Sequence, residues 1–304
     1  MKKLSDLVYY QETLNKLSTT NTIRLVNAEL EQFIYLTKSS DLISNLSAIN
    51  HSLEEFNETF VKIKQDLKLT IEQEEKPLFQ LSYQLHEEFP KFLPDHILDL
   101  RLNVHEEVKD IIRTRLKFYV GWQHAAMFIR PAKENFITQL LSAEPLYVLD
   151  HSYDLLAPTI DSFNDVYKNR VRQYTIDDIN NQVYFEHIPD GQFGICVAFM
   201  YFDFKPLQVI KQYFIELYQK LKPGGTLAIT FNNCDYAGAV KYAEVGWRCY
   251  TPGYLVKELA HSAGFEINYE WHEPQGAITW IELRKPGVLT STRGGQILAR
   301  IMPK

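Results

Sequence analysis

The stretch that most constrains the fold is residues 193–230, where an apolar run, a helical pattern, a glycine turn and a second apolar run follow one another. The first run, Phe193 to Met200, has the length and composition of a buried strand. The helical pattern places apolar residues three or four apart on one face, and it ends at Lys-Pro-Gly-Gly, where Pro cannot continue a helix and Gly permits positive φ. The second run, Thr226 to Thr230, follows at once. This order predicts a βαβ unit with parallel strands and a right-handed crossover.

Glycine is absent from the first part of the chain, and all thirteen glycines lie from Gly121 onward. Long helices avoid glycine because of its entropic cost, whereas α/β domains use it in their turns. The distribution predicts a helical, coiled-coil-like domain over residues 1–115 and an α/β domain over residues 116–304, with the boundary near residues 112–117.

Apolar residues from Leu42 to Leu67 follow one another in alternating steps of four and three, and the positions between them are mostly polar. This a/d pattern predicts a long helix from about Asp41 to about Leu69. An earlier helix fits residues 3–36, and the short link after it predicts an antiparallel helical hairpin.

Two further helices are expected over residues 74–89 and 94–110. The a/d pattern leaves two interpretations open. In the first, the helix over residues 41–69 packs inside the chain as part of a helical cap on the α/β domain. In the second, this helix mediates self-association or docking to a larger assembly. The second interpretation is favoured because the apolar stripe contains only two positions in seven. A helix that packs on a globular core usually has a wider apolar stripe.

Composition excludes several classes of protein. Hydrophobic residues make up 45% of the chain, enough for a sizeable core, and the formal net charge of −6 argues against broad nucleic-acid binding. The three cysteines form no CxxC pair, so neither a disulfide framework nor a zinc site is expected. No apolar run reaches about 18 residues and no signal peptide opens the chain, which predicts a soluble, cytoplasmic protein with no membrane partner.

The α/β domain contains further strand and helix patterns around the βαβ unit. The other strands are expected at residues 116–120, 145–150, 170–176, 267–271 and 277–283. The other helices are expected at residues 131–143, 152–168 and 251–262. The last two strands should form an antiparallel edge pair.

The Leu-Lys-Pro-Gly-Gly turn at residues 221–225, the Ala-Gly-Phe-Glu turn at residues 263–266 and the order of seven strands resemble the class I S-adenosylmethionine (SAM) methyltransferases. The resemblance covers about residues 116–286. It implies a Rossmann-like, mostly parallel sheet with its ligand at the carboxyl ends of the strands. It also implies SAM as the cofactor and methyl transfer to an acceptor that the sequence does not name.

The resemblance implies cofactor contacts for eight residues: Gly121, Trp122, Asp150, His151, Asp177, Asp178, Phe199 and Met200. Gly121 would let the backbone approach the methionine part of SAM. Asp150 would accept hydrogen bonds from the ribose hydroxyls, and Asp177 or Asp178 would face the adenine amine. The two residues that end the fourth strand would line the adenine or methyl pocket.

Three residues are candidates for catalysis: His124, Asp235 and Tyr236. His124 fits a substrate-facing general base as well as a residue that fills space. Asp235 and Tyr236 belong to a polar cluster after the fifth strand, which either orients substrate and accepts a proton or forms an Asx-rich turn that caps a helix. No metal site is expected.

The sequence also departs from the family pattern, because the expected first loop, residues 121–126, contains one glycine and carries bulky Trp122 and His124. The fourth strand lacks the DPPY or NPPY signature of the amino-methyltransferases. Two hypotheses follow: a SAM-dependent methyltransferase, or a catalytically inactive scaffold of the same fold that assembles through its helical arm. The combination of a long helical arm with a methyltransferase-like domain is similar to proteins encoded by large tailed phages. In such a protein the domain could be an enzyme or a component of the virus particle. A nicotinamide-dependent dehydrogenase would need the glycine fingerprint at the first strand.

Overall fold

The structure is a computed structural model, and it describes residues 3–19, 40–88, 106–119, 124–130, 136–178, 183–185, 187–273 and 278–290. The chain forms two compact units, residues 1–77 and 78–304. The division into folding domains near residues 112–117 stays a prediction.

The first unit contains two described helices, α1 (Leu4–Thr19) and α3 (Ser40–Glu74), which pack against each other. The predicted long helix is therefore present and continues to Glu74. The part of the predicted first helix that falls on residues 20–36 lies outside the described residues. None of the helices in the described part of the chain has the length and the apolar run that crossing a bilayer requires.

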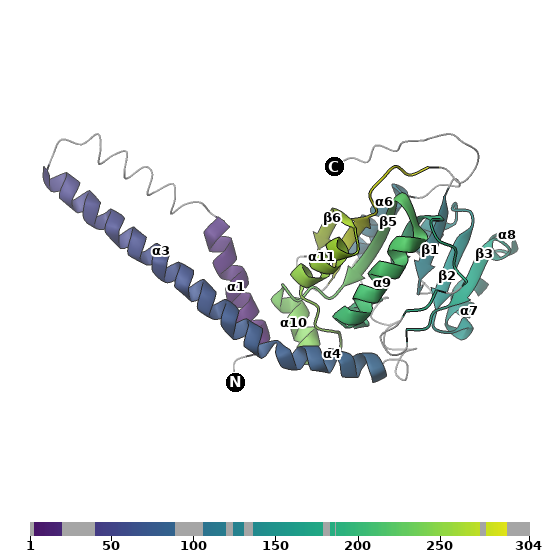
Figure 1. Cartoon of the computed structure of the whole chain (residues 1–304), viewed down its shortest axis with the longest axis horizontal. Helices are drawn as coiled ribbons and strands as arrows, with labels where there is room; N and C mark the ends of the chain where they lie inside the picture. The colour runs from purple at the N-terminus through teal and green to yellow at the C-terminus, as the bar shows by residue number, and fades with distance from the viewer. Residues whose placement is uncertain are drawn as a thin grey trace. The chain divides into compact units, whose positions relative to one another are not determined.

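The second unit is built on one seven-stranded sheet (Figure 1). In chain order its strands are β1 (Ala125–Ile129), β2 (Leu146–Asp150), β3 (Val171–Thr175), β4 (Phe193–Ala198), β5 (Leu221–Phe231), β6 (Glu266–His272) and β7 (Thr279–Arg284). The spatial order is β3-β2-β1-β4-β5-β7-β6, and β7 runs antiparallel to both of its neighbours. The predicted Rossmann-like, mostly parallel sheet with an antiparallel last pair is confirmed.

Helices cover both faces of this sheet. On one face lie α9 (Leu207–Lys220) and α11 (Gly253–Ser262), side by side in Figure 1. On the other face pack α6 (Glu106–Lys117), the 3-10 helix η2 (Ile137–Leu140) and α7 (Tyr153–Asp161). The remaining described helices are α4 (Lys76–Glu88), α8 (Asp165–Lys168), η4 (Phe202–Phe204) and α10 (Ala237–Glu244).

The predicted βαβ unit is present as β4, α9 and β5, with the two strands parallel. The Lys-Pro-Gly-Gly segment belongs to β5, where it bulges out of the ladder, because the partners of β4 jump from Leu221 to Thr226. Gly224 has φ +78°, and a Cβ there would lie 2.4 Å from the backbone nitrogen of Leu289. Glycine is needed at this position because the chain after β7 crosses the bulge.

The predicted first strand at residues 116–120 is wrong. Leu116 and Lys117 end α6, whose apolar residues Val108, Ile112 and Leu116 recur every four positions and are buried. Acidic residues in its first turn and basic residues in its last turn also favour this helix. The helical period therefore outweighed the strand-like composition of the Leu-Lys-Phe-Tyr-Val run. The first strand is β1, which begins at Ala125.

Two predicted helices differ in extent. Residues 136–143 contain only η2, and the predicted helix over residues 152–168 is interrupted between α7 and α8, where the side chain of Asn164 caps α8. A further helix, α10, has no predicted counterpart.

Candidate functional site

Ligands of doubly wound sheets bind at the carboxyl ends of the strands, where the strand order reverses. In this sheet the order reverses between β1 and β4. The candidate site therefore lies at the carboxyl ends of β1 and β4, with those of β2 and β3 beside them.

Polar side chains fill the described part of this edge, and we call them the buried ionic cluster. Its members are Arg130, His151, Asp178, Tyr201, Lys205 and Tyr213. The Lys205 ammonium forms an ion pair with the Asp178 carboxylate, and Lys205 is 1% exposed. The same carboxylate accepts a hydrogen bond from the Tyr213 hydroxyl at 3.2 Å. The hydroxyls of Tyr201 and Tyr213 are 2.5 Å apart.

Burial and charge act in opposite directions on this ion pair. Burial raises the pKa of Asp178, but the Lys205 ammonium together with His151 and His86 outweighs it, and the pKa lies below its ordinary value. Burial lowers the pKa of Lys205, and Asp178 opposes that effect. Because removal of either partner would leave a buried charge uncompensated, each charged group holds the other in place.

Arg130 is the first residue after β1, and it is buried. Its φ of 51° lies in the left-handed region, which is uncommon for a side chain of this size, and its backbone N–H donates to the Leu149 carbonyl at 2.6 Å. Burial lowers the pKa of its guanidinium, whereas Asp150, Tyr201 and other acidic neighbours raise it. The guanidinium thus lies within electrostatic reach of the carboxylate that ends β2.

One histidine, His151, belongs to the buried ionic cluster, and a second, His86, borders it. His151 Nε2 lies 3.2 Å from the Tyr201 hydroxyl, and burial and the Lys205 ammonium lower the pKa of His151. His86 belongs to α4, and burial, followed by Lys205, lowers its pKa to about 4. A histidine from α4 thus reaches the carboxyl edge of the sheet.

The same helix contacts the chain that leads into α11. The Ser82 hydroxyl accepts a hydrogen bond from the Tyr250 backbone N–H at 2.7 Å. The rings of Phe79 and Tyr250 pack edge to face at 5.0 Å. Residues 78–88 therefore run from this connection to the buried ionic cluster and cover part of the candidate site.

Of the predicted cofactor residues, Asp150, His151 and Asp178 come together at this edge. Asp150 is 2% exposed, and its Oδ1 accepts a hydrogen bond from the next backbone N–H, that of His151, at 2.8 Å. Asp177 is exposed and belongs to a separate hollow beside β3. Adjacent carboxylates thus face different surroundings.

Phe199 and Met200 also follow their strand to this edge, and both are in the apolar core. The Phe199 ring packs edge to face on Phe136 at 4.7 Å. Met200 has φ 48°, and its backbone N–H donates to the Thr230 hydroxyl at 2.5 Å. Their roles in a cofactor pocket stay predictions.

Gly121 and Trp122 lie outside the described residues, and in the sequence they precede β1 rather than follow it. His124 lies at the amino end of β1, where it is buried and where its Cβ lies 2.8 Å from the position that a Cβ on Gly194 would take. Because β1, β2 and β4 are parallel, this end is the edge opposite to Asp150. The structure does not bring His124 together with the other predicted site residues.

Asp235 and Tyr236 lie in the turn after β5. The Asp235 carboxylate accepts a hydrogen bond from the backbone N–H of Gly253, the first residue of α11, at 3.0 Å, and burial raises its pKa. The Tyr236 hydroxyl contacts the His272 ring at the surface. These are the contacts of a turn that holds two helix starts together, and a catalytic role for either residue stays a prediction.

Sequence reasoning missed Arg130, Tyr201, Lys205 and Tyr213. The signal for Arg130 was available, since it directly follows the apolar run Ala-Ala-Met-Phe-Ile. The same signal was available for Tyr201, which directly follows the apolar run Phe193 to Met200. Lys205 and Tyr213 gave no signal, because their local sequence does not reveal which distant carboxylate they meet. Within the described ranges, no group of three or more His, Cys, Asp or Glu side chains could hold a metal ion.

The chemistry of the edge can be compared with that of SAM, which carries a sulfonium and an ammonium cation. Arg130 and Lys205 already bring two cations to this edge. The position after β1, where the family uses glycine to let the cofactor approach the backbone, holds the arginine. The Asp150 carboxylate already caps its own turn. Among the described residues, Arg130 is the departure from the family pattern at this edge.

No family model matches the chain, and no curated protein matches it. Solved structures similar to it include a SAM-dependent methyltransferase from Mesorhizobium loti, which is 12% identical and has a TM-score of 0.45 over 58% of this chain and 96% of that one. A Haloferax volcanii protein solved with the Trm112 methyltransferase activator is 11% identical, with a TM-score of 0.47 over 60% of this chain and 92% of the other. A SAM-dependent methyltransferase from Methanosarcina mazei is 12% identical, with a TM-score of 0.43 over 56% of this chain and 95% of that one. The strand order carries the fold assignment, and these matches say nothing of the chemistry of this chain.

Proposed function

We propose that this protein is a catalytically inactive protein with a methyltransferase-like sheet, which serves in assembly through α3. The observation that carries the proposal is Arg130. Its buried guanidinium follows β1 at the place where a cofactor of this family would approach the backbone, and it lies within electrostatic reach of Asp150 and Asp178. The protein's own guanidinium thus acts on the two carboxylates that the family would use for the ribose hydroxyls and the adenine amine.

The assembly part of the proposal depends on the exposed apolar face of α3, which continues the predicted a/d pattern. Ile49, Phe56 and Ile63 are 49%, 54% and 49% exposed. Over about three heptads such a face is long enough for a two-stranded coiled coil. Between residues 50 and 59 the flanking positions Asn50, Ser52, Asn57 and Thr59 are uncharged, so over this stretch two copies of the face can meet without repulsion between like charges. A second copy of this chain is therefore the proposed partner.

SAM-dependent methylation of an unnamed acceptor is the second candidate function, and one observation favours it. Asp150 ends β2 with a buried carboxylate, which is where the family holds the ribose hydroxyls. The hydrogen bond from the His151 backbone N–H uses one oxygen of this carboxylate, Oδ1.

Calorimetric titration of the full chain with SAM and with S-adenosylhomocysteine separates the two candidates. We expect no binding of either compound by the folded protein. Micromolar binding, about −8 kcal/mol, that disappears in Asp150→Ala would overturn the proposal in favour of methylation.

Light scattering tests the assembly part. We expect the parent chain to be a dimer or larger, and Leu53→Asp together with Phe60→Asp to give a monomer, because two buried carboxylates would oppose the packing of the a/d face. Ser47→Asp together with His51→Asp adds the same groups to other faces of α3 and should leave the size unchanged. A monomeric parent chain would mean that its own residues cover the face.

A further inference from the structure

The ion pair between Lys205 and Asp178 is almost fully excluded from solvent. The two side chains are 1% and 7% exposed, and the Lys205 ammonium donates directly to Asp178 Oδ2. The ring of Tyr201 lies over the ammonium, with its centroid 4.8 Å from Nζ. By contrast, the pair of Lys220 with Asp190 leaves its carboxylate 66% exposed. The amine and the carboxyl group of the first pair are therefore in contact in a dry, aromatic environment.

The two oxygens of the Asp178 carboxylate have different neighbours. Oδ2 lies 3.2 Å from the Tyr213 hydroxyl and 3.4 Å from the Tyr201 hydroxyl, and either hydroxyl can donate to it. Oδ1 lies 3.7 Å from Nδ1 of His151. Hydrogen-bond donors around one carboxyl oxygen stabilise the negative charge that develops there when a nucleophile adds to the carbon. An imidazole beside the other oxygen can transfer a proton to it.

The dry environment also changes which chemical state of this pair is favoured. In water an ammonium ion and a carboxylate are more stable than an amide and water, largely because both ions are hydrated. Lys205 and Asp178 have lost that hydration, and a neutral amide costs much less to bury than two charges do. Fixed contact between the reacting groups also corresponds to an effective concentration of up to about 10⁵–10⁸ M. Burial lowers the pKa of Lys205, which brings the amine closer to its neutral, nucleophilic form.

We propose that Lys205 and Asp178 join in an isopeptide bond between Nζ and Cγ. One ammonium proton first moves to the carboxyl group, and the neutral amine then attacks Cγ. The negative charge of the tetrahedral intermediate develops on Oδ2, which faces Tyr201 and Tyr213. The bond from Cγ to Oδ1 breaks, and Oδ1 leaves as water. Of the three ammonium protons, two leave in this water and one stays on the amide nitrogen, so no other reactant is needed.

The bond would connect the chain after β3 with the chain after η4 at the carboxyl edge of the sheet. It would also replace two buried charges by one neutral amide. The proposal is independent of the proposed function, because the reaction requires neither SAM nor α3.

Intact-mass spectrometry of the purified full chain tests the proposal, with circular dichroism as the check that the chain is folded. After incubation at neutral pH until the mass is constant, we expect a mass lower than that of the sequence by one water molecule. Glu186 lies between the two residues in the sequence. Proteolysis after Glu186 should therefore release the peptides of Asp178 and Lys205 as one branched product. Lys205→Arg keeps the buried cation but lacks the amine, and it should have the full mass of its sequence.

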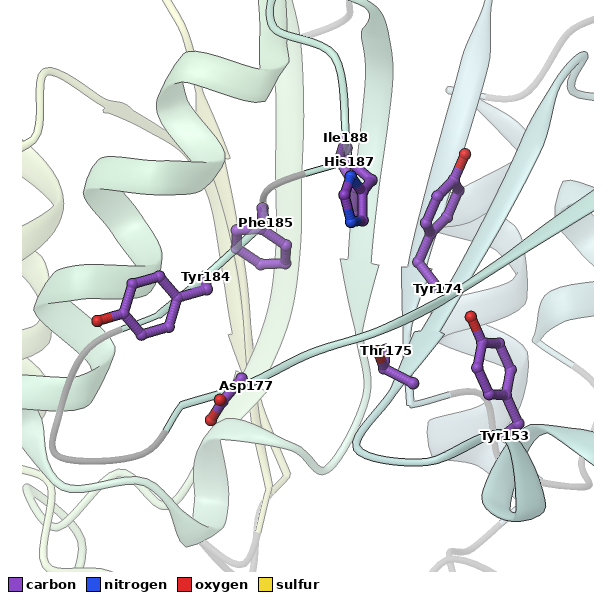
Figure 2. A pocket seen from close by; sticks show the side chains of 8 residues that line it. All are labelled: Tyr153, Tyr174, Thr175, Asp177, Tyr184, Phe185, His187 and Ile188. Carbon is purple, nitrogen blue, oxygen red and sulfur yellow. The ribbon is translucent and has the colours of Figure 1, made fainter.

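Asp177→Asn is the matched control, because this neighbouring carboxylate is exposed. Figure 2 shows it at one end of the hollow beside β3, where it points away from Tyr153 and Tyr174. The variant should lose one water molecule as the parent chain does. Lys220 and Asp190 are an internal control, and their peptides should stay separate because solvent hydrates that carboxylate.

A folded parent chain with the full mass of its sequence would overturn the proposal. So would loss of water in Lys205→Arg, or a branched peptide that joins residues other than Lys205 and Asp178.

Discussion

At the scale of single residues, a buried charge holds two elements together, and Glu282 is the clearest case. It lies in the middle of β7 with no exposed surface. Arg115 of α6 donates to both of its carboxylate oxygens, at 2.7 and 2.6 Å, and the Tyr119 hydroxyl and the Trp280 indole N–H also contact it. Burial raises the pKa of Tyr119, so its hydroxyl stays protonated and able to donate. Three of these four donors belong to α6 and the turn after it, and they fix α6 on the sheet.

We predict that Arg115→Met lowers the free energy of unfolding by about 3–5 kcal/mol, because it leaves the Glu282 carboxylate buried without its cation. Urea denaturation followed by tryptophan fluorescence measures the change, since all four tryptophans lie in the second unit. Arg113→Met is the control, because Arg113 pairs with Asp110 and Glu106 near the surface and should change stability by less than about 1 kcal/mol.

A second variant separates charge from packing. Arg115→Met combined with Glu282→Gln removes both charges, and it should recover part of the loss. If the double variant is as unstable as the sum of the two single variants, the interaction of Arg115 with Glu282 does not carry the effect.

At this scale the sequence predicted positions better than contacts. Asp150 was placed at the end of a strand from its apolar run, because local composition marks strand ends. Glu282 and Arg115 are far apart in the chain, and each looks like an ordinary surface residue in its own local pattern. Only the pairing of β7 with β5 and the packing of α6 bring them together, and a single sequence carries no record of such pairs.

At the scale of elements, the unit β4–α9–β5 was predictable because its hydrophobic patterns match its burial. The two strands are continuous apolar runs that are buried, and the apolar residues of α9 recur on the face that packs on the sheet. The region before β1 was not, because Leu116 fits two patterns at once: the start of a strand-like run and the last apolar position of α6. The tertiary contact of Arg115, in the last turn of that helix, favours the helix. Because of this error, His124 was expected in a loop at the carboxyl edge of the sheet, whereas it lies at the opposite edge.

α4 allows a prediction at the scale of elements, because Ser82 connects it to the chain before α11. The Ser82 hydroxyl accepts from the Tyr250 N–H and donates to the Leu78 carbonyl, and it is 2% exposed. Ser82→Ala leaves the Tyr250 N–H without this acceptor, which should cost about 1–3 kcal/mol. Hydrogen exchange of residues 78–88 should accelerate, while that of β1 should change less. Ser52→Ala on α3, where the exposed hydroxyl bonds only within its helix, is the control.

That outcome would mean that α4 opens locally from the carboxyl edge. If exchange in α4 and in the sheet accelerates equally, α4 is an integral part of one cooperative unit, and the idea of a cover that opens alone is wrong.

At the scale of the whole molecule, the buried titratable groups predict how stability depends on pH. His86 is neutral in the folded chain, since its pKa is lowered to about 4, whereas an unfolded chain binds a proton there below its ordinary value of about 6.5. The unfolded state therefore gains protons first as the pH falls, and stability decreases between about pH 6.5 and pH 4. The lowered pKa values of His151 and Asp178 act in the same direction.

We therefore expect the free energy of unfolding of the second unit to fall by on the order of 2 kcal/mol between pH 7 and pH 5 from His86 alone. Urea midpoints by tryptophan fluorescence at several pH values measure it. His86→Gln should be less stable at pH 7 but should lose less stability on acidification, because the glutamine does not titrate. His51→Gln, on the exposed surface of α3, should keep the slope of the parent chain. If His86→Gln keeps the parent chain's slope of unfolding free energy against pH, His86 is not the group that titrates. The pH dependence then comes from other groups such as His151 and Asp178.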